Sequence, residues 1–104
     1  MFVRVASFEG ADFDALQELN ERGMADGSLN PPEATKGVLV LADRDAGRHQ
    51  VLTFFDSRQA IVDAEQRFEQ MGDEIPVAVR GRRVSVDVFE VVYSMQAAEA
   101  LADA

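Results

Sequence analysis

Two apolar runs joined by a short polar turn constrain this chain more than any other feature. Residues 38–42 (VLVLA) are apolar without interruption, and residues 50–55 (QVLTFF) are rich in β-branched and aromatic side chains. Neither run is long enough for a helix, and both have the composition of strands. Between them, residues 43–47 (DRDAG) place Asp at the start of a type I turn and offer Gly47 for the positive φ that closes a longer loop. The stretch therefore predicts a β-hairpin.

The hairpin leads directly into a helix. Asp56 stands at the expected N-cap, and Gln59 three residues later completes a capping box. Gly72 is predicted to end the helix. Apolar side chains recur between these limits at helical spacing, at Ile61, Ala64, Phe68 and Met71.

Further elements flank this unit. The pattern predicts a strand over 2–8, a helix from about Asp12 to Gly23 or Gly27, a stiff loop over 27–35 that contains Pro31 and Pro32, a short extended piece over 77–79 and a strand over 83–92. The order βαββαβ is that of an α+β, ferredoxin-like fold, an antiparallel sheet with both helices on one face. We expect residues 1–93 to form one domain and residues 94–104 to form a tail that makes a short helix or frays.

Composition excludes several classes of function. The 104 residues carry a net charge of -9, which argues against nucleic acid or an anionic membrane as partner. Without cysteine there is no disulfide or thiolate chemistry, and with one histidine we expect neither a metal site nor a cofactor. Neither a leader-like start nor a long apolar run is present, so we expect a cytoplasmic protein.

The strands are apolar on both faces, whereas two helices cover only one. Residues 38–41 and most of 51–55 would place large side chains on the uncovered face. Burying roughly six to eight of them at about 1.5–3 kcal/mol each sums to the order of 10 kcal/mol or more. That is comparable with the whole stability of a small domain. We therefore predict a homodimer in which a second copy covers this face.

Four polar residues are candidate catalytic groups, and each also has a plain structural interpretation. His49 is either a surface or cavity-rim histidine or a ligand contact and general base. Arg4 and Asp87 lie within apolar first and last strands, where they form either a cross-strand ion pair or polar groups of a ligand cavity. Tyr93 either anchors the strand end or donates to a ligand. The remaining basic cluster, Arg80, Arg82 and Arg83, is expected to be solvated or to pair with the acidic second helix.

The hairpin and helix GVLVLADRDAGRHQVLTFFDSRQAIVDAE, closed by RRVSVDVFEVV, resemble the dimeric α/β-barrel proteins of the antibiotic-biosynthesis monooxygenase (ABM) type. The resemblance runs from Val3 to about Val92, and its best motif is the aromatic, acidic, Ser sequence at residues 55–57. It implies that two sheets face each other in a dimer. Some members of the family oxidise quinol-like aromatic molecules without a cofactor, and a related branch degrades haem.

The chain departs from the enzymes of that family. It has no Trp, Phe55 stands where the family often places that ring, and its two Asn residues fall on a helix and a loop. The haem-degrading branch has a His on the second helix and an Asn on the first strand. This chain has no His over 57–71, and its first strand offers only Ser7. Haem degradation is therefore not expected.

Two functions remain open on these grounds. One is a cofactor-independent monooxygenase or related enzyme that acts on a small aromatic or apolar molecule. The other is a non-catalytic homodimer that binds a small ligand or has a structural role. In either case we expect a ligand between the sheet and the helices beside the loop at 27–35, against Thr53, Phe55 and Phe68.

Overall fold

The computed structural model describes residues 1–27 and 31–95. Its elements are β1 (Phe2–Glu9), α1 (Phe13–Asp26), β2 (Gly37–Asp43), β3 (Arg48–Phe55), α2 (Arg58–Glu74), α3 (Val77–Arg80) and β4 (Arg82–Glu90). This confirms the predicted order of strands and long helices and adds one helical turn, α3, where an extended piece was expected. Most of the expected C-terminal tail, residues 96–104, lies outside the described residues.

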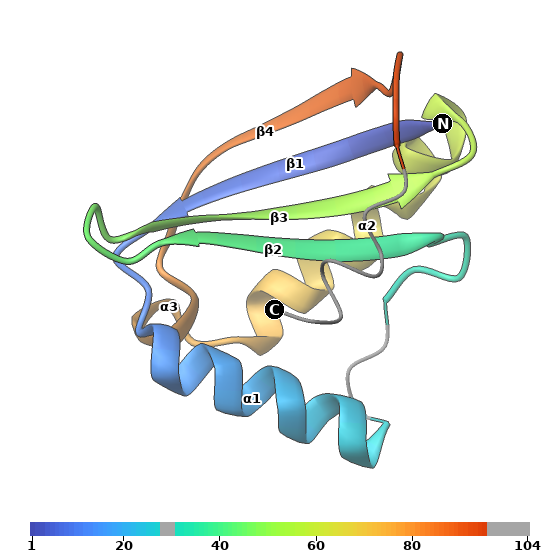
Figure 1. Cartoon of the computed structure of the whole chain (residues 1–104). Coiled ribbons are helices and arrows are strands. Elements are labelled where there is room, and N and C mark those ends of the chain that lie inside the picture. The colour runs from blue at the N-terminus through green and yellow to red at the C-terminus, as the bar shows by residue number, and fades with distance from the viewer. Residues whose placement is uncertain (28–30, 96–104) are drawn as a thin grey trace.

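The four strands form one antiparallel sheet in the order β2-β3-β1-β4. Figure 1 shows α1 and α2 on the same side of this sheet, so that no helix of the described residues lies over the other face. We call that other side the open face. The predicted ferredoxin-like α+β fold is confirmed. In the described part of the chain, no helix has the length and apolar character needed to span a bilayer.

The hairpin between β2 and β3 closes as its sequence predicts. Asp43 Oδ1 accepts a hydrogen bond from the Ala46 backbone N–H at 3.1 Å, as Asp does at the start of a turn. Gly47 adopts φ 66°, and its N–H donates to the Arg44 carbonyl at 3.3 Å. This turn holds the β2 and β3 ends in register, with Asp43 opposite Arg48.

Helix α2 begins and ends later than predicted. Its N-cap is Ser57, whose Oγ accepts from the Ala60 N–H at 3.1 Å, whereas Asp56 makes an exposed ion pair with Lys36 at 3.4 Å. The helix also continues through Gly72 to Glu74. Arg80 explains this extension, because its Nε donates to the Gly72 and Ile75 carbonyls that would otherwise lack partners at the helix end.

The start of helix α1 and the turn α3 are each set by local hydrogen bonds. The Asp12 side chain caps α1 by accepting from the Ala15 N–H at 3.0 Å, and Gly27 ends it at φ 73°, so Gly23 lies inside the helix. Pro76 precedes α3, and its carbonyl accepts from the Val79 and Arg80 N–H groups at 2.9 and 3.0 Å. That local turn replaces the extended conformation expected over 77–79.

The core lies between the sheet and α2. Phe55 is fully buried and packs with Ile61 and Ala64. Partly buried apolar side chains surround this cluster, namely Phe2, Ala60, Phe68 and Val88. Because side chains alternate along a strand, the other half of each strand points to the open face.

We expect Ser57→Ala to lower the free energy of unfolding by about 1 kcal/mol, because one N–H at the start of α2 loses its acceptor. Asp56→Ala is the matched control and should cost about 0.5 kcal/mol or less, since it removes only an exposed ion pair. Urea denaturation followed by circular dichroism measures both. A larger loss for Asp56→Ala would contradict the assignment of the cap.

Candidate functional site

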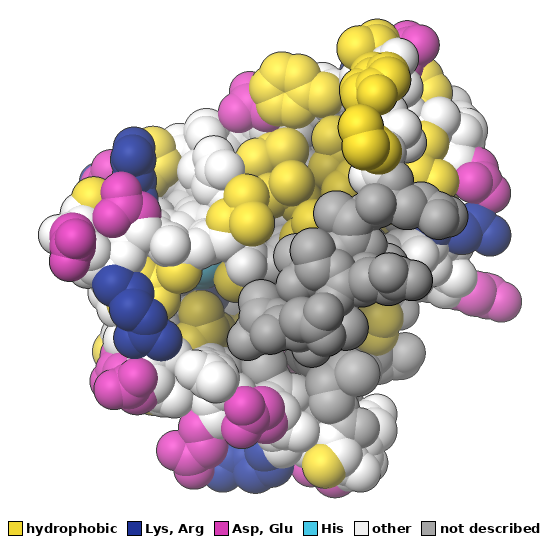
Figure 2. All heavy atoms as spheres, in the orientation of Figure 1, with side chains coloured by type: hydrophobic (Ala, Val, Ile, Leu, Met, Phe, Trp, Pro, Cys, Tyr) yellow, Lys and Arg dark blue, Asp and Glu magenta, His cyan; other side chains and the backbone are white. Residues whose placement is uncertain are grey.

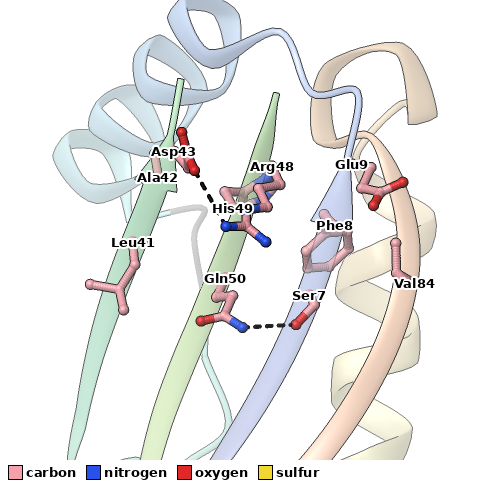
Figure 3. A pocket seen from close by; sticks show the side chains of 10 residues that line it. All are labelled: Ser7, Phe8, Glu9, Leu41, Ala42, Asp43, Arg48, His49, Gln50 and Val84. Carbon is pink, nitrogen blue, oxygen red and sulfur yellow. Dashed lines mark hydrogen bonds and ion pairs between the residues drawn. The ribbon is translucent and has the colours of Figure 1, made fainter. Parts of the chain in front are cut away.

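The open face is hollowed at its hairpin end (Figure 3). The hollow has a volume of about 430 Å³. It is lined by Ser7, Phe8, Glu9, Leu41, Ala42, Asp43, Arg48, His49, Gln50 and Val84. Val84 has no partner residue on β1, because Ser7 pairs with Ser85 and Phe8 pairs with Arg83. This irregularity in β4 shapes the wall of the hollow to which Val84 belongs.

The charged side chains of the hollow, and Ser7 and Gln50, have partners in hydrogen bonds and ion pairs. Gln50 Nε2 donates to Ser7 Oγ at 3.2 Å across the two central strands. At the rim Arg48 pairs with Asp43 at 3.4 Å, and Arg82 pairs with Glu9 at 3.1 Å. These ion pairs are exposed and contribute little to stability. The apolar walls come from Leu41 and Val84. The hollow therefore offers hydrogen-bonding groups and apolar contact with no uncompensated charge at its rim.

His49 lies behind the hollow, with its ring on the helix side of the sheet. The ring stacks on Phe8 with centroids 4.8 Å apart and meets Phe13 edge-on at 5.8 Å. Only 3% of the residue is exposed, so His49 is not a surface histidine, although it borders the hollow as the cavity-rim alternative expects. Its buried Nδ1 has no hydrogen-bond partner among the described residues. Loss of hydration lowers the pKa of His49 below its usual 6.5, because burial disfavours the charged form.

Arg4 also faces the helices and is buried there. Its Nε donates to Glu65 Oε1 at 2.9 Å, and its guanidinium lies 3.9 Å from the centroid of Phe68. The predicted cross-strand ion pair with Asp87 is wrong. In the observed register Arg4 pairs with Val88 and Asp87 pairs with Val5, which places the two charges on opposite faces.

The residues expected to line a ligand site lie together inside the core. Phe55 meets Phe68 edge-on with centroids 6.1 Å apart, and Thr53 is buried on the same face. The hollow on the open face touches none of the three, and their contact with a ligand remains a prediction. Tyr93 is exposed beyond the end of β4. The four candidate catalytic residues are thus not brought together.

The basic cluster behaves as expected in part. Arg83 pairs with Glu69 of α2 at 2.9 Å, whereas Arg82 pairs with Glu9 of β1 and Arg80 binds backbone carbonyls. Within residues 1–27 and 31–95, no three acidic or histidine side chains converge as a metal site would require.

The sequence analysis missed Ser7 and Gln50. Both occupy positions at which the alternation on the open face changes from apolar to polar. On that face β1 runs Val3, Val5, Ser7, and the antiparallel β3, followed in the same direction, runs Phe54, Leu52, Gln50. That change was visible in the sequence. The register that places the two side chains opposite each other was not.

We expect Glu65→Gln to lower the free energy of unfolding by about 1–2 kcal/mol, because the buried Arg4 loses its counter-charge. The loss stays moderate because the Glu65 side chain is half exposed, so that solvent screens the pair. The double variant Arg4→Met, Glu65→Gln should be at least as stable as Glu65→Gln alone, since an apolar side chain replaces the unpaired charge. Guanidinium denaturation of the parent, Arg4→Met, Glu65→Gln and the double variant measures the coupling. If the losses of unfolding free energy in the two single variants simply add in the double variant, the ion pair between Arg4 and Glu65 contributes no coupling, which would contradict the described contact.

The comparisons with known proteins concern the fold. No protein-family model matches the chain, and no curated protein sequence matches it significantly. The chain is similar in structure to the haem degrader MhuD from Mycobacterium tuberculosis, solved with two haems in its active site, at 19% identity and a TM-score of 0.63. The match covers 92% of this chain and 100% of MhuD.

Two further structures are similar over 92% of this chain. A mutant of MhuD with two manganese protoporphyrin IX molecules per active site is 18% identical over 99% of its length, with a TM-score of 0.54. A Deinococcus radiodurans structure assigned to the antibiotic biosynthesis monooxygenases is 11% identical over 97% of its length, with a TM-score of 0.43. The chain therefore has the fold of MhuD, in agreement with its resemblance to the ABM type.

Proposed function

We propose that the protein is a homodimer whose two open faces pack together and hold a small apolar or aromatic molecule between them, without turnover. The observation that carries this proposal is the composition of the open face. Seven large apolar side chains occupy it, namely Val3, Val5, Leu39, Leu41, Leu52, Phe54 and Phe89. Figure 2 shows hydrophobic side chains gathered over the sheet.

Several of these side chains remain in contact with solvent in the single chain. Leu41 is 49% exposed and Phe89 is 55% exposed. A contiguous apolar surface of this kind usually marks an interaction site in a soluble protein. The charged groups on the same side lie at its margins, with Glu9, Asp43 and Arg48 towards the hairpin end and Asp87 on the edge strand β4. An apolar centre with a polar periphery is the usual anatomy of a protein interface, and one such patch can serve both subunits.

The hollow provides a place for the ligand in such a dimer. Its volume of about 430 Å³ falls within the range of small-molecule sites. The hollow is open in one chain, and a partner sheet lying over the open face would enclose it. Leu41 and Val84 supply apolar contact, while the Ser7–Gln50 pair can orient one polar atom of the ligand.

The positions of the candidate catalytic residues support binding rather than turnover. A cofactor-independent monooxygenase needs a base and an orienting group that converge on one substrate. Here Asp87 lies on the open face and Tyr93 beyond β4, whereas His49 borders the hollow with its ring stacked on Phe8 on the helix side. Arg4 is on the helix side as well, but it is already paired with Glu65.

Haem, which MhuD is described as binding, does not fit the described residues. Haem iron in proteins is held by an axial His, Cys, Met or Tyr that opens into a slot for the ring. The one histidine is 3% exposed and packed between Phe8 and Phe13. Tyr93 is exposed beyond β4, and no tyrosine or methionine of the described residues lines the hollow. On the same side of the sheet, Phe55 and Phe68 fill the space next to α2. We therefore derive no chemistry through haem.

We expect Leu41→Asp, and independently Phe54→Asp, to convert the dimer into a folded monomer, because each places an unpaired carboxylate within the paired apolar faces. The matched control is Val62→Asp, which changes an exposed position on α2. Light scattering at micromolar concentration should give twice the 11.4 kDa chain mass for the parent and Val62→Asp.

The same experiment contains the result that would overturn the proposal. If the parent protein, with native circular dichroism, has the mass of one chain, the open faces do not pair. If Leu41→Asp remains dimeric, the dimer uses another surface.

We expect haem titration to produce no saturable Soret band, because His49 cannot reach an axial position while it is packed between two rings. Absorption spectra during addition of hemin measure this, with His49→Ala as the control. A band that saturates at one equivalent and is lost in His49→Ala would show that the residue binds iron.

A further inference from the structure

We infer that His49 is an acid-operated latch that holds the N-terminal turn of α1 against the sheet when it is neutral and releases that turn when it is protonated. The inference concerns the helix side of the molecule. It therefore does not depend on pairing of the open faces or on a ligand in the hollow.

The geometry places the histidine ring between the sheet and the start of the helix. Phe8 of β1 lies parallel to the ring at 9°, and Phe13, the first residue of α1, meets it edge-on at 80°. The neighbouring backbone supplies two further links at this end, from the Gly10 N–H to the Gly47 carbonyl at 2.9 Å and from the Asp12 N–H to the Val79 carbonyl at 3.0 Å. Asp14 of the first turn also pairs with Arg44 of the hairpin at 3.5 Å. The His49–Phe13 contact is the aromatic attachment of the first turn of α1 to β3.

Protonation of His49 creates a conflict at this contact. The buried Nδ1 has no hydrogen-bond partner, so a proton there would become a donor without an acceptor. The positive charge would also be held in a site where the residue is 3% exposed. Stacking on Phe8 favours the imidazolium, but this contact offsets only part of the loss. Separation of Phe13 from the ring would admit water to Nδ1 and remove the conflict.

The surrounding acidic groups are all engaged elsewhere. Asp12 accepts from the Ala15 N–H, Asp14 pairs with Arg44, Asp43 pairs with Arg48, and Glu9 pairs with Arg82. Arg44 also lies over the outer side of Phe13, at 5.4 Å from its centroid. Arg83 of β4 pairs with Glu69 of α2 and lies opposite Phe8 in the sheet. None of these groups is a hydrogen-bond partner of Nδ1, and the nearby arginines oppose protonation.

The direction of the pH effect follows from the two states. In the docked state, burial lowers the pKa of His49 below 6.5. In the released state the ring regains an ordinary pKa of about 6.5. The released state therefore binds more protons, and the population of opened α1 increases as the pH falls below that value. The increase approaches tenfold per pH unit until the docked histidine itself titrates.

Hydrogen exchange followed by NMR tests the latch. After correction for intrinsic exchange rates, the opening of amides at residues 16–20 in α1 should be more frequent at pH 5.5 than at pH 7.5, by up to about tenfold. Amides in the middle of α2 should change much less, and they serve as the internal control. In His49→Phe, which keeps an aromatic ring and removes the proton, the pH dependence of α1 should disappear. His49→Leu replaces that variant if the larger ring prevents folding.

Three results would overturn the inference. Equal acceleration in α1 and α2 would mean that protonated His49 destabilises the whole domain rather than releasing one helix. Retention of the pH dependence in the His49 variants would assign it to another group. Titration of His49, seen in its own ring proton shifts, with no change in α1 exchange would mean that the docked helix accommodates the charge.

Discussion

The structure depends on a sheet that is apolar on both faces although its helices cover only one. On the helix side, burial of Phe55 against Ile61 and Ala64 provides the hydrophobic stabilisation of the single chain. On the open face, an equivalent set of side chains, including Leu41 and Phe89, stays in contact with solvent. This asymmetry links fold to function, because an apolar face of this size needs an occupant. A second copy is the simplest one, since the same patch then serves both chains.

The packed side of the sheet also limits what the protein can do chemically. Arg4 brings a charge into this region, but Glu65 and Phe68 hold its guanidinium in place. The histidine at the hairpin end borders the hollow, but its ring is packed between two aromatic rings. The fold shared with MhuD does not by itself assign the chemistry of a haem degrader to this chain, because function depends on the residues of a site and not on the fold.

Much of the fold could be predicted from the sequence because local signals agree with one another. The two apolar runs, the turn at Gly47 and the amphipathic helix each favour the same arrangement. One error in the predicted helix limits arose where a contact with a residue outside the helix overrode a local sequence rule. Gly72 did not end α2, because Arg80 from beyond the helix satisfies its carbonyls. Asp56 and Ser57 are both good N-caps, and no sequence rule separates them by one residue.

The candidate site was less predictable because it depends on register. Arg4 and Asp87 were paired from their positions near the middle of neighbouring strands, but a shift of one residue places them on opposite faces. The same uncertainty hid the approach of Gln50 to Ser7. The burial of His49 was hidden for another reason. It results from contact with Phe13, which lies on a helix 36 positions earlier in the chain, and periodicity does not report such contacts.

The central claim, that the open face is covered by a second copy, can be tested directly by isotope-filtered NMR on a mixture of labelled and unlabelled chains. The account predicts intermolecular contacts among side chains of the open face, such as Leu39, Leu52 and Phe89. It also predicts none from the outer surface of α2, such as Val62. Intermolecular contacts only from the helices, or none in a protein that remains folded, would contradict it.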